Sequence, residues 1–188
     1  MKKFTNAVIY GHKDANEILV ENGKIKAIGR DLGPADEVID VEGKMISAPY
    51  VDPHLHLDYV YTLSELGQDG AGSGTLFEAI EMWPKFKSNL TVDSVKRLAL
   101  KGIYDEVSQG VQHIRTHIDV TDPNFTALKA MLELKEEMKN IVDIQIIAFP
   151  QEGMYTYKGG LELVEEALKM GADVVGGIPH YEPAREFG

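Results

Sequence analysis

Two histidines, His54 and His56, stand one residue apart in the stretch Val-Asp-Pro-His-Leu-His-Leu-Asp at positions 51–58. Apolar Ile46 and Val51 lead into them, which is typical of the end of a buried strand. Side chains alternate along a strand, so residues two apart point the same way. Two imidazoles on one face can share a divalent ion, and imidazole suits zinc and iron. The stretch therefore predicts metal ligation by His54 and His56, although two histidines can also meet in a strand by chance.

The bulk composition limits what else this chain could bind. Its 188 residues are 44% hydrophobic and 26% charged, as in soluble globular proteins with a real core. A formal net charge of −11 argues against nucleic acid and anionic membranes as partners, and it is compatible with a small neutral substrate. The chain has no cysteine, so a metal must rest on histidine and carboxylate ligands. No apolar stretch follows Lys2 and Lys3, and none later could span a bilayer, so we expect a cytoplasmic location.

The first 48 residues indicate a small β region. Apolar stretches at 17–20 and 24–28 flank Asn22-Gly23, a strong signal for a two-residue hairpin turn. Taken alone, this region could be no more than a solubilising appendage.

The motifs together resemble the metal-dependent amidohydrolase superfamily. In that superfamily, the same His-x-His closes the first strand of a (β/α)8 barrel, preceded by a stretch like Val-Ile-Asp-Val-Glu-Gly-Lys at 38–44. Residues 73–78 (SGTLFE), 115–117 (RTH), 149–153 (FPQEG) and 177–180 (GIPH) are similar to the bacterial cytosine deaminases. The Phe-Pro-Gln-Glu-Gly motif is the most specific of these. The resemblance also implies that the N-terminal region belongs to a small β-sandwich.

Helices alternate with strands after the histidine motif. Thr75 and Glu78 form a predicted capping box, and Pro84 is expected to kink or end the helix that they open. Further helices are predicted from Thr91 to Gly110, over 125–139 and over 161–169. The glycine-rich stretch 66–74 is either a mobile cover over a pocket or a plain solvated loop.

The strand predicted at 111–120 has an ionisable face. Period two puts Ile114 and Ile118 on one side, and it puts His113, Arg115, His117 and Asp119 on the other. These four side chains could form a satisfied network that only orients the fold. Alternatively, His117 or Asp119 could support metal ligands from the end of the strand.

Gln151 follows the next strand, predicted at 141–150. A glutamine amide carries a donor and an acceptor side by side, which matches the edge of a pyrimidone ring. Gln151 could merely cap a loop, but the resemblance implies that it binds the base. A last strand is predicted at 172–180, where His180 is a candidate for pocket lining. The resemblance implies a bridging lysine near this point in two-metal members, and none is present, which favours one ion, Fe2+ or Zn2+.

Alternating strands and helices predict an α/β fold with a parallel sheet. Four strands are visible, whereas a closed barrel needs eight strands and about 250 residues. We therefore expect a β-sandwich portion at 1–48 and the first half of a (β/α)8 TIM barrel at 49–188. Open strand edges predict association with a second copy, as in a homo-oligomer, or with a missing half.

The resemblance implies a hydrolytic deaminase that converts cytosine to uracil and ammonia. A divalent ion makes water a better nucleophile at neutral pH, and Gln151 would orient the ring. The family's remaining ligands and its proton-transferring glutamate come from later strands. This chain is therefore expected to contain no catalytic residue and to show no turnover alone. Isoguanine, creatinine or triazine deamination is an alternative, and ring-amide hydrolysis of the dihydroorotase kind fits less well. An inactive fragment that serves as a binding or assembly module is the non-enzymatic alternative.

Overall fold

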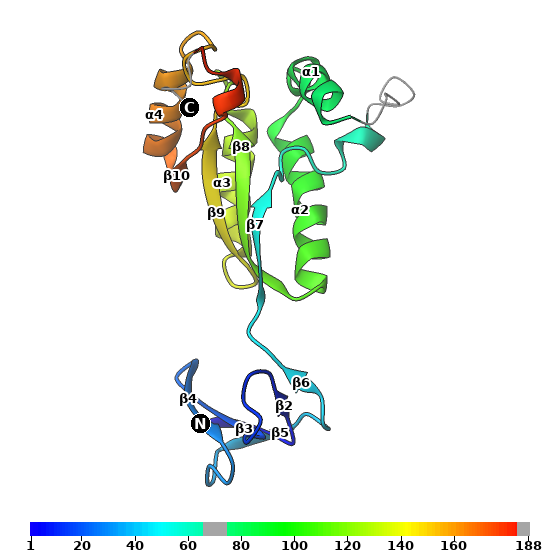
Figure 1. Cartoon of the computed structure of the whole chain (residues 1–188), viewed down its shortest axis with the longest axis vertical. Coiled ribbons are helices and arrows are strands. Elements are labelled where there is room, and N and C mark those ends of the chain that lie inside the picture. The colour runs from blue at the N-terminus through cyan, green and yellow to red at the C-terminus, as the bar shows by residue number, and fades with distance from the viewer. Residues whose placement is uncertain (66–74, 184–188) are drawn as a thin grey trace. The chain divides into compact units, whose positions relative to one another are not determined.

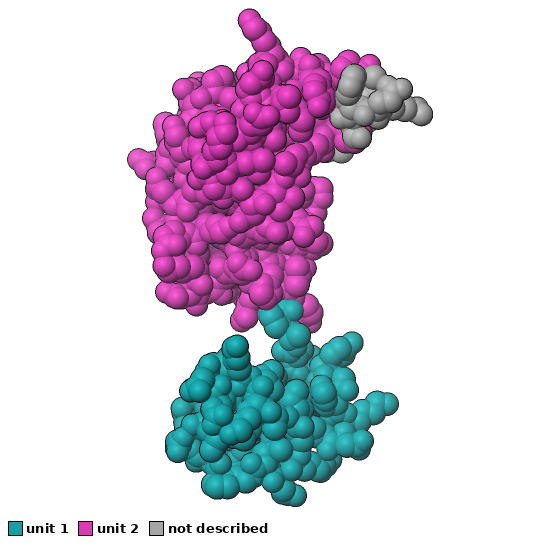
Figure 2. All heavy atoms as spheres, turned by 90° about the vertical axis from the view of Figure 1, so that its left-hand side faces the viewer, with its two compact units in different colours: residues 1–49 teal, residues 50–188 magenta. Residues whose placement is uncertain are grey.

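The chain divides into two compact units, Met1–Pro49 and Tyr50–Gly188, which Figure 2 colours separately. The computed structural model describes residues 1–65 and 75–183. The glycine-rich stretch 66–74, predicted to be a cover or a loop, lies outside the described residues.

Unit 1 is built from short strands around a hairpin. Strands β3 (Glu17–Glu21) and β4 (Lys24–Gly29) pair antiparallel, and Asn22 and Gly23 between them have φ of 52° and 74°. Positive φ at both turn positions is the type I′ geometry, so the predicted hairpin is confirmed. The sheet order is β4-β3-β1-β5, with β1 at Lys2–Thr5 and β5 at Glu37–Asp40. A separate parallel pair joins β2 (Val8–Ile9) to β6 (Met45–Ile46).

Unit 2 is an α/β unit whose four described strands form one parallel sheet in the order β10-β9-β8-β7 (Figure 1). This confirms the predicted parallel α/β fold. The strands are β7 (Tyr50–Leu55), β8 (Val111–Asp119), β9 (Asp143–Phe149) and β10 (Val174–Val175). The helices between them are α1 (Leu76–Lys87), α2 (Val92–Ser108), α3 (Thr126–Met138) and α4 (Gly160–Met170).

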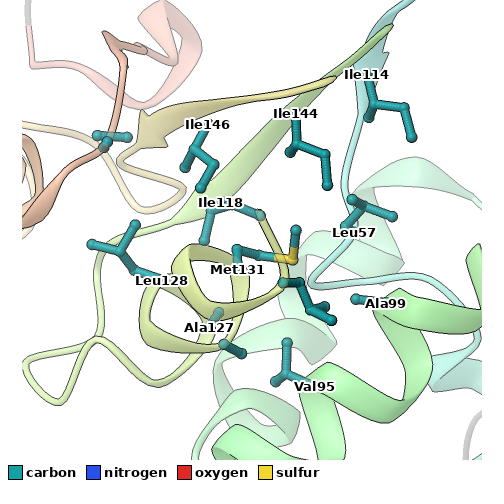
Figure 3. Packing of buried hydrophobic residues seen from close by; sticks show 14 of the residues in the cluster. Leu57, Val95, Ala99, Ile114, Ile118, Ala127, Leu128, Met131, Ile144 and Ile146 are labelled. Atoms are coloured by element: carbon teal, nitrogen blue, oxygen red, sulfur yellow. The ribbon is translucent and has the colours of Figure 1, made fainter. Parts of the chain in front are cut away.

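The core of unit 2 lies on one face of this sheet. Ile118 of β8 and Ile146 of β9 lie beside Leu128 and Met131 of α3, and Ile114 of β8 lies above Leu57 (Figure 3). All of these side chains are fully or almost fully buried. The alternation predicted for β8 is confirmed, because the other face of that strand carries its ionisable side chains. Packing on one face thus leaves the opposite face to carry polar groups.

Two predicted boundaries were wrong. Helix α1 does not end at Pro84 but continues to Lys87, and side chains of its last turns are bound to the ends of β8 and β9. A kink at Pro84, the other expectation, stays a prediction. Strand β10 has only two residues and does not reach His180, which lies in a short 3-10 helix, Pro179–Tyr181. Gly176 and Gly177 directly follow β10, and Pro179 beyond them has no amide hydrogen to donate to a ladder.

Candidate metal centre

Three histidines meet where neighbouring parallel strands end. His54 is the last residue but one of strand β7, His56 follows that strand directly, and His117 is near the end of β8. Carboxyl ends of parallel strands lie at one edge of the sheet, and the register sets Leu55 opposite Thr116. The alternation of side chains then turns all three rings to the same side.

The three rings are close enough to share one ion. His54 and His117 stack with centroids 4.1 Å apart and an interplanar angle of 22°, while His56 lies 5.4 Å from each. Each residue offers one nitrogen, and these nitrogens all lie within 4.8 Å of one another. The structure thus brings the two predicted ligands together and adds a third imidazole.

Burial lowers the pKa of two of these imidazoles, those of His56 and His117. Burial, followed by the proximity of His117 and His54, lowers the pKa of His56 to about 4. The pKa of His117 is lowered as well, by burial and then by His54. A neutral imidazole has a free lone pair for a metal, so no proton needs to leave at neutral pH.

Several buried polar atoms beside the rings have no hydrogen-bond partner among the described residues. They are Nδ1 of His56, Nδ1 of His117, Oδ1 of Asp58 and the hydroxyl of Tyr59. Buried polar atoms in folded proteins are almost always paired, so a cluster of unpaired ones indicates that a ligand belongs there. The donor set fits a divalent transition metal, because three imidazole nitrogens are typical ligands of such sites.

Two buried polar side chains, Asp58 and Thr116, join the segment after β7 to strand β8. Oδ2 of Asp58 accepts a hydrogen bond of 2.8 Å from the backbone N–H of Asp119, and the hydroxyl of Thr116 accepts one of 3.0 Å from the N–H of Leu57. Both bonds join the segment after β7 to β8. Complete burial raises the pKa of Asp58 well above its usual value. The carboxylate of Asp58 and the hydroxyl of Thr116 therefore position the loop that carries His56.

Aromatic side chains form the walls of the site. Phe149, the last residue of β9, has its ring centroid 5.5 Å from that of His56 and 5.7 Å from that of His117, both edge to face. Tyr59 lies 5.3 Å from His56 and stacks on Trp83 of α1 at 3.7 Å. These rings exclude water from one side of the histidines.

Gln151 lies just beyond Phe149 at the same edge of the sheet. It is 6% exposed, and its backbone N–H donates to the carbonyl of Phe149. Its role in binding a base remains a prediction.

The sequence left the role of His117 open, between a polar network that orients the fold and support of the metal ligands. Its position on the polar face near the end of a strand was the available signal. Its proximity to His54 depends on the register between β7 and β8, and that register is irregular between Asp52 and Leu55. Such an irregularity has no reliable sequence signature.

The comparisons agree with this geometry, although no family model matches the chain. A 5-methylcytosine deaminase from Klebsiella pneumoniae, solved with 5-fluorocytosine, is 42% identical with a TM-score of 0.86 over 98% of this chain and 45% of its own. N-isopropylammelide isopropyl amidohydrolase from Pseudomonas sp. (strain ADP) is 34% identical over 157 residues, which are 82% of this chain and 39% of the relative. The chain belongs to the amidohydrolase superfamily.

A second solved structure extends the likeness within the superfamily. N-isopropylammelide isopropylaminohydrolase from Burkholderia multivorans ATCC 17616 is 26% identical with a TM-score of 0.76, over 93% of this chain and 44% of its own. The chain spans less than half the length of each of these three relatives. None of the described helices is long and apolar enough to cross a membrane.

Proposed function

We propose that this chain supplies the metal-binding and base-binding part of a hydrolytic deaminase that acts on cytosine or its 5-methyl derivative. One observation carries the proposal. Three imidazoles gather at the carboxyl edge of a parallel sheet, in a chain 42% identical to a 5-methylcytosine deaminase. Pyrimidine deamination of this kind yields uracil, or its 5-methyl derivative, and ammonia.

The roles of the residues follow from their chemistry. His54 and His56 would hold one divalent ion, Fe2+ or Zn2+, and the neutral ring of His117 is close enough to join them. When bound, such an ion supplies a water that is activated at neutral pH. The amide of Gln151 would donate to and accept from the amide-like edge of the base, which fixes the ring. Phe149 and Tyr59 keep bulk water away from His56.

Metal binding tests the first half of the proposal. Titration of the metal-free chain with Zn2+ at neutral pH should show one equivalent bound, and a chelator should reverse it. The double variant H54A/H56A should bind none. Weak binding without a defined stoichiometry, unchanged in the double variant, would favour the alternative of an inert binding or assembly module.

Ammonia release tests the second half. A polypeptide of the relatives' length that carries this sequence should deaminate cytosine or 5-methylcytosine faster than isoguanine, creatinine or N-isopropylammelide. Gln151→Ala should raise KM for the preferred base, because the amide contacts are lost. The 188-residue chain alone should bind metal without turnover. Robust metal-dependent turnover from it would contradict the assignment of the remaining catalytic groups to another part of the protein.

A triazine-type substrate is the second candidate. The amidohydrolase from Pseudomonas that is 34% identical is named for N-isopropylammelide. A preference for that compound over both pyrimidines in the same substrate panel would select this candidate.

A further inference from the structure

Lys87, in the last turn of α1, binds groups at the ends of two strands at once. Its Nζ lies 3.0 Å from Oδ2 of Asp119, 2.9 Å from the carbonyl and 3.0 Å from the hydroxyl of Thr121, and within hydrogen-bond distance of Glu152. Asp119 ends β8, and Glu152 lies just after β9. One ammonium group therefore joins a helix to both strands.

Trp83, one turn earlier in α1, reinforces this contact. Its indole Nε1 donates a hydrogen bond of 2.7 Å to the same Oδ2 of Asp119. Trp83 and Asp119 are each 3% exposed, so the carboxylate has almost no access to water. A buried carboxylate needs compensating charge and donors, and Lys87 supplies the charge. Burial lowers the pKa of the lysine amine, but Asp119 and Glu152 outweigh this and raise it, so Lys87 stays charged.

The contact continues from α1 to both parts of the proposed site. On the metal side, Trp83 stacks on Tyr59, and Tyr59 packs against the ring of His56. Asp119 is also two residues from His117. On the base side, Glu152 directly follows Gln151. Among the described residues, no other cationic side chain forms an ion pair with Asp119 or Glu152.

We propose that Lys87 is a positioning residue that fixes α1 on the ends of β8 and β9 and thereby holds the Tyr59–Trp83 stack against His56. The part of this proposal that concerns metal binding at His56 rests on the proposed function. Loss of the ammonium group leaves Asp119 underpaired, so the last turn of α1 separates from the sheet. Trp83 then gains access to water, and the wall beside His56 loosens.

The test uses Trp83 as its own reporter, because it is the only tryptophan in the chain. Lys87→Met removes the charge at similar length, Lys87→Arg keeps it, and Lys85→Met is the matched control at an exposed position of the same helix. Trp83 emission and its quenching by acrylamide are measured on the metal-free chain. Affinity for Co2+ is measured by the visible absorption of the bound ion.

In K87M, we expect red-shifted emission and a severalfold larger quenching constant. We also expect Co2+ affinity to fall by about tenfold, the lower range for residues that support metal ligands. K87R should restore both measurements, and K85M should match the unmodified chain. H54A/H56A should lose Co2+ without exposing Trp83, which separates the role of Lys87 from the metal site itself.

Unchanged Trp83 emission and quenching in folded K87M would overturn the proposal. So would a loss that arginine does not restore, since this would assign Lys87 a packing role only. If K87M does not fold, Glu152→Ala, which removes one partner of Lys87, should give a smaller change in the same direction; no change would likewise contradict the proposal. If the unmodified chain binds no Co2+, the metal site fails, and the Trp83 measurements alone decide the role of Lys87.

Discussion

His54 and His117 stack across two neighbouring strands at 4.1 Å, an arrangement that suits neutral rings and opposes charged ones. Two imidazolium ions at this distance would repel each other, and burial of His117 adds a further cost for its charge. A divalent cation held by the ring nitrogens would reverse this balance, because their in-plane lone pairs would then face positive charge. The cluster is therefore suited to bind a metal ion rather than protons.

His117 can be tested against a histidine of the same strand. His117→Ala should weaken Zn2+ binding by about tenfold or more, whether the ring is a ligand or supports one. His113→Ala is the matched control, because His113 lies at the opposite end of β8 and pairs with Asp143 at 3.4 Å. Isothermal titration calorimetry of both variants measures the difference. Equal affinities would remove His117 from the metal site.

The sequence predicted which side chains share a face where this depends only on their spacing along one strand. The pairing of His54 with His56 follows from one intervening residue, and the polar face of β8 follows from alternation. The contact of Lys87 with Asp119 and Glu152 could not be predicted in this way. It joins residues 32 and 65 positions apart, and it depends on how α1 packs on the sheet.

Helix starts and turns were also predictable, because their signals are local. Thr91 caps α2 with a complete capping box to Ser94, and the hydroxyl of Thr75 caps α1 through the N–H of Glu78. The ends of elements were less predictable. Tertiary contacts carried α1 past Pro84, whereas β10 stopped early where Gly176 and Gly177 follow it.

The start of α4 gives a prediction at the scale of elements. A Cβ at Gly160 would lie 2.5 Å from the carbonyl oxygen of Met154 and 2.9 Å from that of Gly153. These atoms belong to the backbone of the loop that follows Gln151, so they cannot move independently. Gly160→Ala should destabilise the chain by about 1–3 kcal/mol, as overpacking does.

Urea denaturation followed by Trp83 emission measures this loss. Gly177→Ala is the control, because a Cβ there meets no atom within 4 Å, and its effect should stay within about 0.5 kcal/mol. Equal stability of the two variants would mean that the loop after β9 adjusts freely. It would then be a poor support for Gln151.

At the scale of the whole molecule, metal binding should appear as stability of unit 2. A ligand that binds only the folded state at 100 times its Kd adds about 2.7 kcal/mol. Zn2+ should therefore raise the urea midpoint reported by Trp83, which lies in unit 2. Excess chelator should cancel the shift, and H54A/H56A should show none. A shift that persists in the double variant would place the stabilising ion elsewhere.

The sheet of unit 2 has one apolar and one polar face, and this pattern made its layered α/β architecture predictable from the sequence. Buried isoleucines at period two and helices at period 3.6 specify a parallel sheet covered by helices on one face. Four parallel strands, β7 to β10, are half the number that a closed (β/α)8 barrel needs, so barrel closure stays a prediction.

The strand order also sets how backbone amides should exchange with solvent. Among the described strands, β7 lies at an edge of the sheet and β8 is flanked on both sides. Amides of β7 should therefore exchange faster than those of β8 in the metal-free chain. An ion shared by His54 and His117 would join the edge strand to the interior one. Deuterium uptake by β7 would then slow toward that of β8, which would map metal occupancy along the peptide backbone.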